Sequence, residues 1–368
     1  MQSTAPSLNN GDHTLKIALI ADTHWGIRND SQVFYDYFKR FLDDVFFPTL
    51  EKEGIKQVIH LGDLVDRRKY ANYLTLSRLR RDFLEECERR CIDVYIIPGN
   101  HDVFYKNTNE INALREIITG RYQFIHVIEK PVTITFDSTD ILLLPWICED
   151  NYEESMNAIK TTTGQVVCGH LELNGFEMFK GSISDHGMDH KLFDRFDVVC
   201  SGHYHHKSDT GNIHYLGAFA EYTWSDFDDP RGFHVFDTEI RELTFIRNPY
   251  RMFEKVWYDD AGKTVEEVVF DREIDVRNKM VKLIVKNKTN PYWFDLFVDR
   301  IEKEGVIDLQ VVEDHLHLDL LADEDIIDEA EDTLTVCKKY IASMNLSVDQ
   351  KKLDRVITNL YTEALQIE

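Results

Sequence analysis

Short apolar runs and amphipathic stretches alternate along the chain from residue 15 to about residue 245. Runs rich in β-branched residues and bounded by turn residues predict strands. Longer stretches whose apolar residues recur on one face predict helices. The expected strands are residues 15–20, 57–60, 94–97, 141–144, 166–168, 198–200 and 232–236, and the expected helices are residues 31–51, 71–90 and 109–119. This alternation is typical of an α/β layer fold.

A second pattern begins near Asn248. A strand at 279–285, a helix at 292–304 and a strand at 306–312 predict a small β-α-β module. Residues 321–368 predict a helical tail, because apolar residues recur there at the spacing of one helix face. We therefore expect a polar, disordered leader at 1–14, a main domain at 15–247, a capping domain at 248–320 and the tail at 321–368.

The composition agrees with a folded chain of several domains. Its 368 residues fit two or three domains of ~100–200 residues each. A hydrophobic fraction of 43% with 12% aromatic residues can fill such cores, which excludes a disordered or collagen-like chain. No apolar run approaches the ~18 residues that cross a bilayer, and the start of the chain has no apolar signal block. We expect a cytoplasmic protein with no membrane segment.

Five of the predicted strands are followed at once by side chains that can bind a metal ion. Because the carboxyl ends of strands in an α/β sheet lie along one edge, these side chains should converge. A mixture of carboxylate, imidazole and amide donors suits Mn²⁺, Fe²⁺ or Zn²⁺ better than Ca²⁺. A shared carboxylate can hold two such ions ~3.5–4 Å apart for phosphoryl displacement. The five segments are Asp22-Thr23-His24, Gly62-Asp63, Gly99-Asn100-His101-Asp102, Gly169-His170 and Gly202-His203-Tyr204-His205.

These five blocks, in this order, resemble the calcineurin-like metallophosphoesterase superfamily. The resemblance implies an α/β fold in which helices flank a β-sandwich, and a centre of two divalent ions, with Mn²⁺ expected and Mg²⁺, Fe²⁺ or Zn²⁺ as alternatives. It also implies that His101 faces the scissile phosphate and stabilises charge or protonates the leaving oxygen. By the same resemblance Asp22, His24 and His205 bind the first metal, Asn100, His170 and His203 bind the second, and Asp63 bridges them.

Within the superfamily, the Ala-Asp-Thr-His-Trp-Gly run at 21–26, the Gly-Asn-His-Asp quartet and the closing Gly-His-x-His are similar to SbcD-type nucleases of double-strand-break repair. The order of domains, a phosphoesterase core followed by a small β-α-β cap and a helical tail, is also similar. The short chain is closest in length to the bacteriophage recombination endonuclease subunits. The resemblance is firm over residues 15–245 and architectural beyond them. It implies an enzyme of DNA repair, recombination or replication that is an exonuclease on duplex ends and an endonuclease on single strands or hairpins, in the host cytoplasm if phage-encoded.

The same family resemblance implies two protein partners. The helical tail would bind an SbcC-like, SMC-type ATPase, and packing of the tail on its own domain is the alternative. Family members also form homodimers through helices beside the active site. Bulky apolar residues cover more than one face of the helix at 31–51, which is consistent with a dimer or with burial on two sides within one chain. They are Val33, Phe34, Tyr37, Phe38, Phe41, Leu42, Val45 and Phe46.

Two other functions remain open. The run at 62–68, Gly-Asp-Leu-Val-Asp-Arg-Arg, also resembles protein serine/threonine phosphatases, in which the arginine grips phosphate. A phosphomonoesterase or protein phosphatase is therefore the alternative to a nuclease. The nuclease is favoured, because those phosphatases have Glu after the Asn-His pair and lack the closing Gly-His-x-His. A non-catalytic scaffold for the ATPase is a further alternative, but the intact set of costly polar ligands argues against it.

The net charge of −24 argues against a nucleic-acid binder, because binding to the phosphate backbone depends largely on basic surface. Two divalent ions would add about four positive charges where the phosphate must lie. Local basic residues would add more: Arg67 and Arg68 are candidate phosphate contacts. Lys282, Lys286 and Lys288 share one face of a predicted strand and are candidate contacts to the DNA backbone, with an ordinary solvated face as the alternative.

Overall fold

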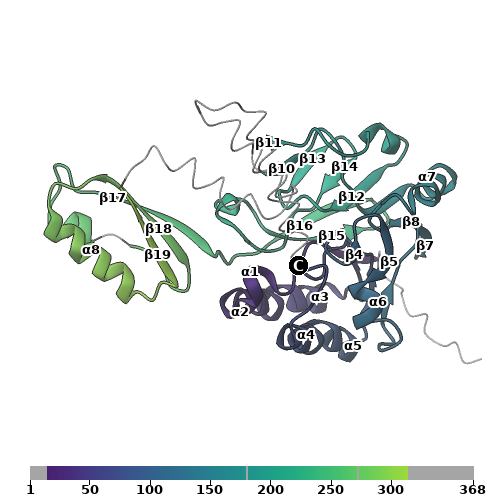
Figure 1. Ribbon diagram of the computed structural model, residues 1–368, viewed down its shortest axis with the longest axis horizontal. Coiled ribbons are helices and arrows are strands. Elements are labelled where there is room, and N and C mark those ends of the chain that lie inside the picture. The colour runs from purple at the N-terminus through teal and green to yellow at the C-terminus, as the bar shows by residue number, and fades with distance from the viewer. Residues whose placement is uncertain (1–14, 180, 272, 314–368) are drawn as a thin grey trace, which may run out of the picture. The chain divides into compact units, whose positions relative to one another are not determined.

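The computed structural model describes residues 15–179, 181–271 and 273–313 (Figure 1). They fall into two compact units. The first comprises the described residues up to Tyr222 together with Asp228–Met252, and the second comprises Thr223–Phe227 and the described residues from Phe253 onward. The expected leader and the expected tail lie outside the described residues.

Two six-stranded sheets form the framework of the first unit. In the first sheet β1, β2, β3 and β6 run parallel, and β15 pairs antiparallel with β1. In the second sheet β8, β9, β12 and β14 run parallel. The first sheet has the order β16 (Glu242–Arg247), β15 (Gly232–Asp237), β1 (Lys16–Ile20), β2 (Gln57–His60), β3 (Asp93–Ile96), β6 (Ile125–Val127); the second has β13 (Ser208–Thr210), β14 (Ile213–Tyr215), β12 (Val198–Gly202), β9 (Val166–His170), β8 (Thr139–Leu144), β7 (Val132–Phe136).

The two sheets share one hydrophobic core. Alternate residues of β1, such as Ile17 and Leu19, join Ile141 and Leu143 of β8 in a single buried cluster. The side chains at intervening positions are buried on the opposite face, as Ala18 of β1 shows. Burial on both faces explains why these strands are continuous apolar runs in the sequence. All seven predicted strands are present, and the predicted β-sandwich is confirmed.

Helices cover the outer faces of both sheets. Phe41 and Phe46 from the first predicted helix contact Phe233 of β15, with ring centroids 6.1 and 5.0 Å apart. On the second sheet, Met156 and Ile159 of α7 (Tyr152–Thr161) are buried in a separate cluster. Figure 1 shows α1 to α5 grouped together. The first helices are α1 (Ile27–Asp30), α2 (Gln32–Phe41), the π-helix η1 (Leu42–Phe46), α3 (Phe47–Glu53), α4 (Tyr73–Leu79), the π-helix η2 (Arg80–Leu84) and α5 (Glu85–Arg89).

The helix predicted at 109–119 is partly wrong. Thr108–Asn112 forms the strand β5, which pairs with β4 (Val103–Tyr105), and only Ala113–Ile117 is helical, as α6. Asn112 marks the boundary, because its backbone is extended and its side-chain oxygen accepts a hydrogen bond from the backbone N–H of Arg115 at 2.8 Å. An N-cap asparagine thus starts the helix later than the apolar pattern indicated.

The apolar helix at 31–51 is buried within its own chain. Six of the eight residues that suggested a dimer are at most 8% exposed. The ring of Phe38, for example, lies 4.9 Å from that of Phe219. The apolar pattern therefore requires no second copy of the chain, and the alternative of burial on two sides accounts for it.

The second unit contains a three-stranded parallel sheet with the order β17 (Phe253–Asp259), β18 (Met280–Asn287), β19 (Asp308–Val312). The predicted β-α-β module is present as β18, α8 (Pro291–Lys303) and β19. Strand β17 and the π-helix η5 (Glu266–Phe270) were not predicted. Figure 1 shows α8 alongside the sheet. Its Phe294 and Phe297 are buried in one cluster with Leu283 of β18.

Short elements complete the described chain: β10 (Glu177–Phe179), β11 (Ser182–Ile183) and the 3₁₀ turns η3 (His190–Phe193) and η4 (Trp224–Asp226). Among the described residues, none of the helices has the length and apolarity that would be needed to cross a membrane.

Candidate metal centre

The predicted ligands come from the carboxyl ends of strands in both sheets. Asp22 and Asp63 follow β1 and β2 in the first sheet. His170 is the last residue of β9, and His203 directly follows β12, in the second sheet. Strand β1 runs parallel to β2, and β9 runs parallel to β12. The carboxyl ends of each pair therefore lie at one edge of their sheet, where the side chains can meet.

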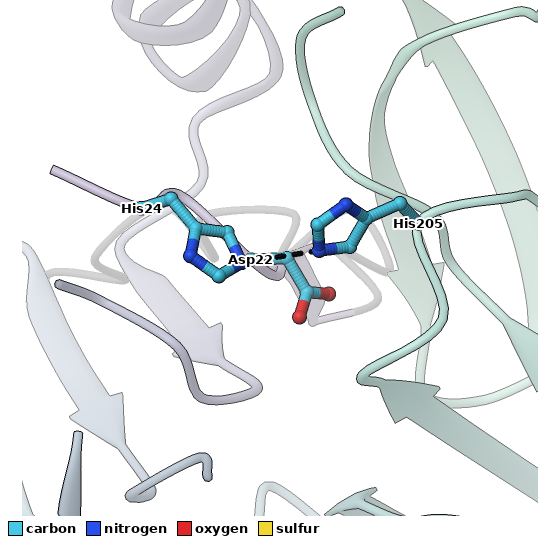
Figure 2. A group of neighbouring side chains, drawn as sticks. All are labelled: Asp22, His24 and His205. Carbon is cyan, nitrogen blue, oxygen red and sulfur yellow. Dashed lines mark hydrogen bonds between the residues drawn. The ribbon is translucent and has the colours of Figure 1, made fainter. Parts of the chain in front are cut away.

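The first group of ligands consists of Asp22, His24 and His205, whose donor atoms all lie within 4.8 Å of one another. Figure 2 shows the two imidazole rings turned toward each other beside the carboxylate. The Nε2 atoms of His24 and His205 are 3.1 Å apart. Without a cation, one of these two nitrogens must carry a hydrogen to avoid opposed lone pairs. All three residues are buried, so the arrangement fits a metal ion well.

The second group is centred on the side-chain oxygen of Asn100. His170 Nε2 and His203 Nδ1 each lie 2.9 Å from it. His170 Nδ1 donates to the carbonyl oxygen of Leu61 at 2.7 Å, because a carbonyl can only accept. This bond orients the ring so that Nε2 points into the site, as outer partners of metal-binding histidines do.

Asp63 reaches both groups. Its Oδ2 atom is 3.7 Å from His24 Nε2 and 3.4 Å from His170 Nε2. Its Oδ1 atom accepts a hydrogen bond of 2.7 Å from the backbone N–H of His101. A single buried carboxylate between ring nitrogens of the two ligand groups is the arrangement expected of a bridging ligand.

The electrostatics of the site favour positive charge. Burial raises the pKa of Asp22 to about 6, although His170 and His205 oppose the rise. Burial also raises the pKa of Asp63, but the neighbouring His170 and His101 outweigh it and hold this pKa well below its usual range. Burial lowers the pKa of His170, yet Asp63 and Asp22 raise it to about 9. The carboxylates thus stabilise a cation in this pocket, and the residues fit divalent ions.

Four of the predicted ligands have left-handed backbone conformations. Asp22, His24, Asp63 and His203 have φ angles of 52°, 41°, 54° and 87°. Such conformations cost of order 1–3 kcal/mol each for residues other than glycine, and they persist only where the surrounding structure fixes them. The strained backbone at these four ligands indicates that the surrounding fold holds their side chains in place for a function.

His101 and Asp102 support the centre from the loop after β3. His101 Nδ1 lies 2.6 Å from the carbonyl oxygen of Asp66, so it carries the hydrogen and Nε2 is the atom left for chemistry. The buried Asp102 carboxylate accepts hydrogen bonds from the backbone N–H groups of Leu64, Val65 and Gly99 at 3.2, 3.0 and 2.9 Å. It thereby ties together the loops after β2 and β3.

Asp66 is a site residue that the sequence analysis missed. Its Oδ1 atom lies 3.6 Å from His24 Nδ1, and its carboxylate groups with His24 and His101 as a third set of metal-competent side chains. The contact to Nδ1 leaves Nε2 of His24 for the first metal group. The only sequence signal was its position three residues after Asp63 in the run at 62–68.

The predicted phosphate contacts lie in different environments. Arg67 is engaged, since its Nη2 atom lies 2.7 Å from Asp30 Oδ2. Arg68 is half-buried, and within the described part of the chain it has no hydrogen bond or ion pair. Burial lowers the pKa of Arg68, and the charge of Asp63 opposes this, so the guanidinium is within electrostatic reach of the centre.

The three lysines of β18 and its end do not form one exposed row. The expectation that Lys282 lies on a solvated face is wrong: it is 5% exposed, and its Nζ atom lies 4.3 Å from the centre of the Trp224 ring. Lys286 is exposed. Lys288 is exposed too, and its Nζ atom lies 2.8 Å from Glu313 Oε1. The ring that Lys282 contacts belongs to a segment, Thr223–Phe227, that is distant in sequence.

Comparison with known proteins gives consistent matches. Residues 15–207 match the model of the calcineurin-like phosphoesterase family. Exonuclease subunit 1 of Enterobacteria phage T4 is 32% identical over 364 residues, covering 96% of this chain and all of that one. The SbcD component of the SbcCD nuclease from Staphylococcus saprophyticus is 22% identical, covering 95% of this chain and 99% of that one. The component of the same name from Staphylococcus epidermidis is 24% identical, covering 77% and 79%.

The close approach of Gly99 to Asp63 gives a test of the centre. A Cβ atom at Gly99 would lie 2.1 Å from Asp63 Oδ1 and 2.4 Å from its backbone nitrogen. Gly99→Ala should therefore displace the carboxylate and lose at least one equivalent of bound metal, measured by elemental analysis after dialysis against Mn²⁺. The control is Gly120→Ala, where nothing lies within 4 Å of the added atom; the left-handed backbone there, with φ 73°, makes this variant strained too, but outside the centre, so its metal content should stay that of the wild type. Wild-type metal content in a folded Gly99→Ala protein would contradict the assigned position of Asp63.

Proposed function

The chain belongs to the calcineurin-like phosphoesterase family, and we propose that it acts within that family as a two-metal DNA nuclease. The observation that carries this proposal is the position of the buried Asp63 carboxylate between His24 of one ligand group and His170 of the other. The relatives named above as an exonuclease subunit and as nuclease components support DNA as the substrate. The proposed activities are exonuclease on duplex ends and endonuclease on single-stranded or hairpin DNA.

Two divalent ions, when bound, would activate a water nucleophile and neutralise charge on the phosphate. Asp22, His24 and His205 would hold one ion and Asn100, His170 and His203 the other, with Asp63 shared. Mn²⁺ is the proposed ion, because mixed imidazole, carboxylate and amide donors suit it. The alternatives are Mg²⁺, Fe²⁺ and Zn²⁺.

His101 would protonate the leaving sugar oxygen. Its Nδ1–H is committed to the carbonyl oxygen of Asp66, so Nε2 is the atom that can carry and release a proton. The ring centroid of His101 lies 4.8 Å from that of His24, which places it at the edge of the first metal group without making it one of the predicted ligands.

Arg68 is the better of the two arginines for a phosphate contact. Arg67 would have to leave its ion pair with Asp30 before it could bind phosphate. The guanidinium of Arg68 is unengaged among the described residues and close enough to feel the charge of Asp63. Bidentate guanidinium–phosphate bonds would then position the DNA strand. Among the three lysines, the exposed Lys286 is the side chain best suited to contact the DNA backbone.

The proposed function includes a protein partner, because the chain itself is acidic. A chain with a net charge of −24 gains little from counterion release on DNA, so further affinity must come from another protein. We place the chain in the cytoplasm as the nuclease subunit of a complex with an SbcC-like, SMC-type ATPase, with its tail at 321–368 as the docking segment. Homodimerisation belongs to the same proposal, although the buried helix at 31–51 does not require it.

Replacing His101 separates catalysis from metal binding. His101→Asn should abolish turnover, because the amide cannot donate a proton to the leaving oxygen near neutral pH. The metal content should remain that of the wild type, since His101 is not among the seven assigned ligands. Both quantities are measured on one preparation, by DNA cleavage and by elemental analysis. Loss of an ion from this variant would make His101 a ligand instead of a proton donor.

The nuclease function itself is tested with end-labelled DNA. Purified protein with Mn²⁺ should shorten linear duplex DNA and cut single strands, with more activity when the ATPase is added. Asp63→Asn should lower the rate by at least ~100-fold, as expected when charge stabilisation at the reacting centre is removed. Asp185→Asn changes a carboxylate whose side chain is 90% exposed and should have no effect. Efficient release of phosphate from phosphoproteins with no DNA cleavage would favour the phosphatase alternative instead.

A further inference from the structure

Trp146 lies beside the second metal group but is not one of its ligands. The centre of its ring is 5.3 Å from that of His203 and 5.9 Å from that of His170. The residue follows β8 in the second sheet and is half-buried. Nothing in the hydrolytic reaction described above uses an indole ring at this place.

The backbone of Trp146 is held firmly. Its N–H group donates to the carbonyl oxygen of Pro98 at 2.8 Å. Its own carbonyl oxygen accepts hydrogen bonds from the side-chain amides of Asn109 and Asn151, at 2.8 and 2.9 Å. These three hydrogen bonds fix the backbone point from which the indole projects toward His170 and His203.

A cavity of about 110 Å³ opens next to the indole. It is large enough for several water molecules, whose share of liquid volume is about 30 Å³ each. Tyr152, which is 49% exposed, contributes a second aromatic ring. Because His170 forms part of the wall, an occupant would lie directly beside the metal centre. The lining residues are Trp146, Ile147, Tyr152, His170, Glu172, Gly187 and Met188.

We propose that this cavity is a stacking subsite for one base of the nucleotide next to the scissile phosphate, with Trp146 as the platform. The inference rests on the proposed nuclease function. In the proposed nuclease a cavity bounded by His170 would lie beside the scissile phosphate, where the adjoining nucleotide can reach it, and the planar part of a nucleotide is its base. Aromatic side chains bind unpaired bases of any sequence by stacking. A paired base within a duplex presents no free face, so the subsite would act on frayed ends and single strands.

The test compares two single-stranded oligonucleotides that differ at one nucleotide. One is intact, and the other carries a single abasic residue, whose position is varied in a series of otherwise identical strands. Wild-type protein with Mn²⁺ should cleave the bond next to the abasic residue about 5- to 140-fold more slowly, the range that corresponds to stacking of one base. Trp146→Ala should cleave the intact strand at this slower rate and leave the rate on the abasic strand unchanged. Trp146→Phe, which retains a ring, should restore part of the difference.

The controls separate a base contact from a role in supporting the ligands. Tyr105→Ala removes an aromatic side chain that is 50% exposed and does not line the cavity, and it should behave as the wild type. If Trp146→Ala slows both strands equally or loses metal, the indole only supports His170 and His203 and the subsite is refuted. Equal cleavage of both strands by the wild type would also refute it. Failure of the wild type to cut either strand would instead contradict the nuclease function on which the subsite rests.

Discussion

The buried Asp63 carboxylate, which lies between His24 of one ligand group and His170 of the other, holds the central place in this structure. Asp63 lies within 3.7 Å of ring nitrogens from both sets and is only 2% exposed. A negative charge so deeply buried is costly unless a cation or several donors compensate it. Within the chain itself the neighbouring His170 supplies that compensation, with its pKa raised to about 9. The pocket is therefore built for positive charge, and divalent ions meet that demand directly.

The architecture serves this requirement at two levels. Parallel strands from both sheets end at the pocket, so residues almost two hundred positions apart, such as Asp22 and His205, are brought together. The loops between them are then tied by hydrogen bonds, above all those that Asp102 accepts from three backbone N–H groups. The sandwich core fixes the strand ends, and the left-handed conformations at four ligands are tolerated because both restraints act together. The strand ends and the loop hydrogen bonds thus set the ligand geometry together.

The sequence predicted the parts of the site that follow strands. Burial on both faces makes each strand a short apolar run, so the metal-competent side chains that follow a strand are easy to recognise in the sequence. The structure brings Asp22, His24 and His205 together as expected. Asp66 was missed because its role depends on a loop that folds back on His24. Lys282 was misplaced because residues distant in sequence, around Trp224, cover its strand face. In the same way, Asn112 began a helix late through a local cap that an apolar pattern does not report.

Anomalous diffraction at the manganese edge, from a crystal soaked in Mn²⁺, tests the shared carboxylate most directly. The account predicts two anomalous peaks ~3.5–4 Å apart, with Asp63 bound to both ions. One ion would lie against Asp22, His24 and His205, and the other against Asn100, His170 and His203. A single peak, or two peaks of which Asp63 binds only one, would contradict the two-metal centre and the hydrolytic function built on it.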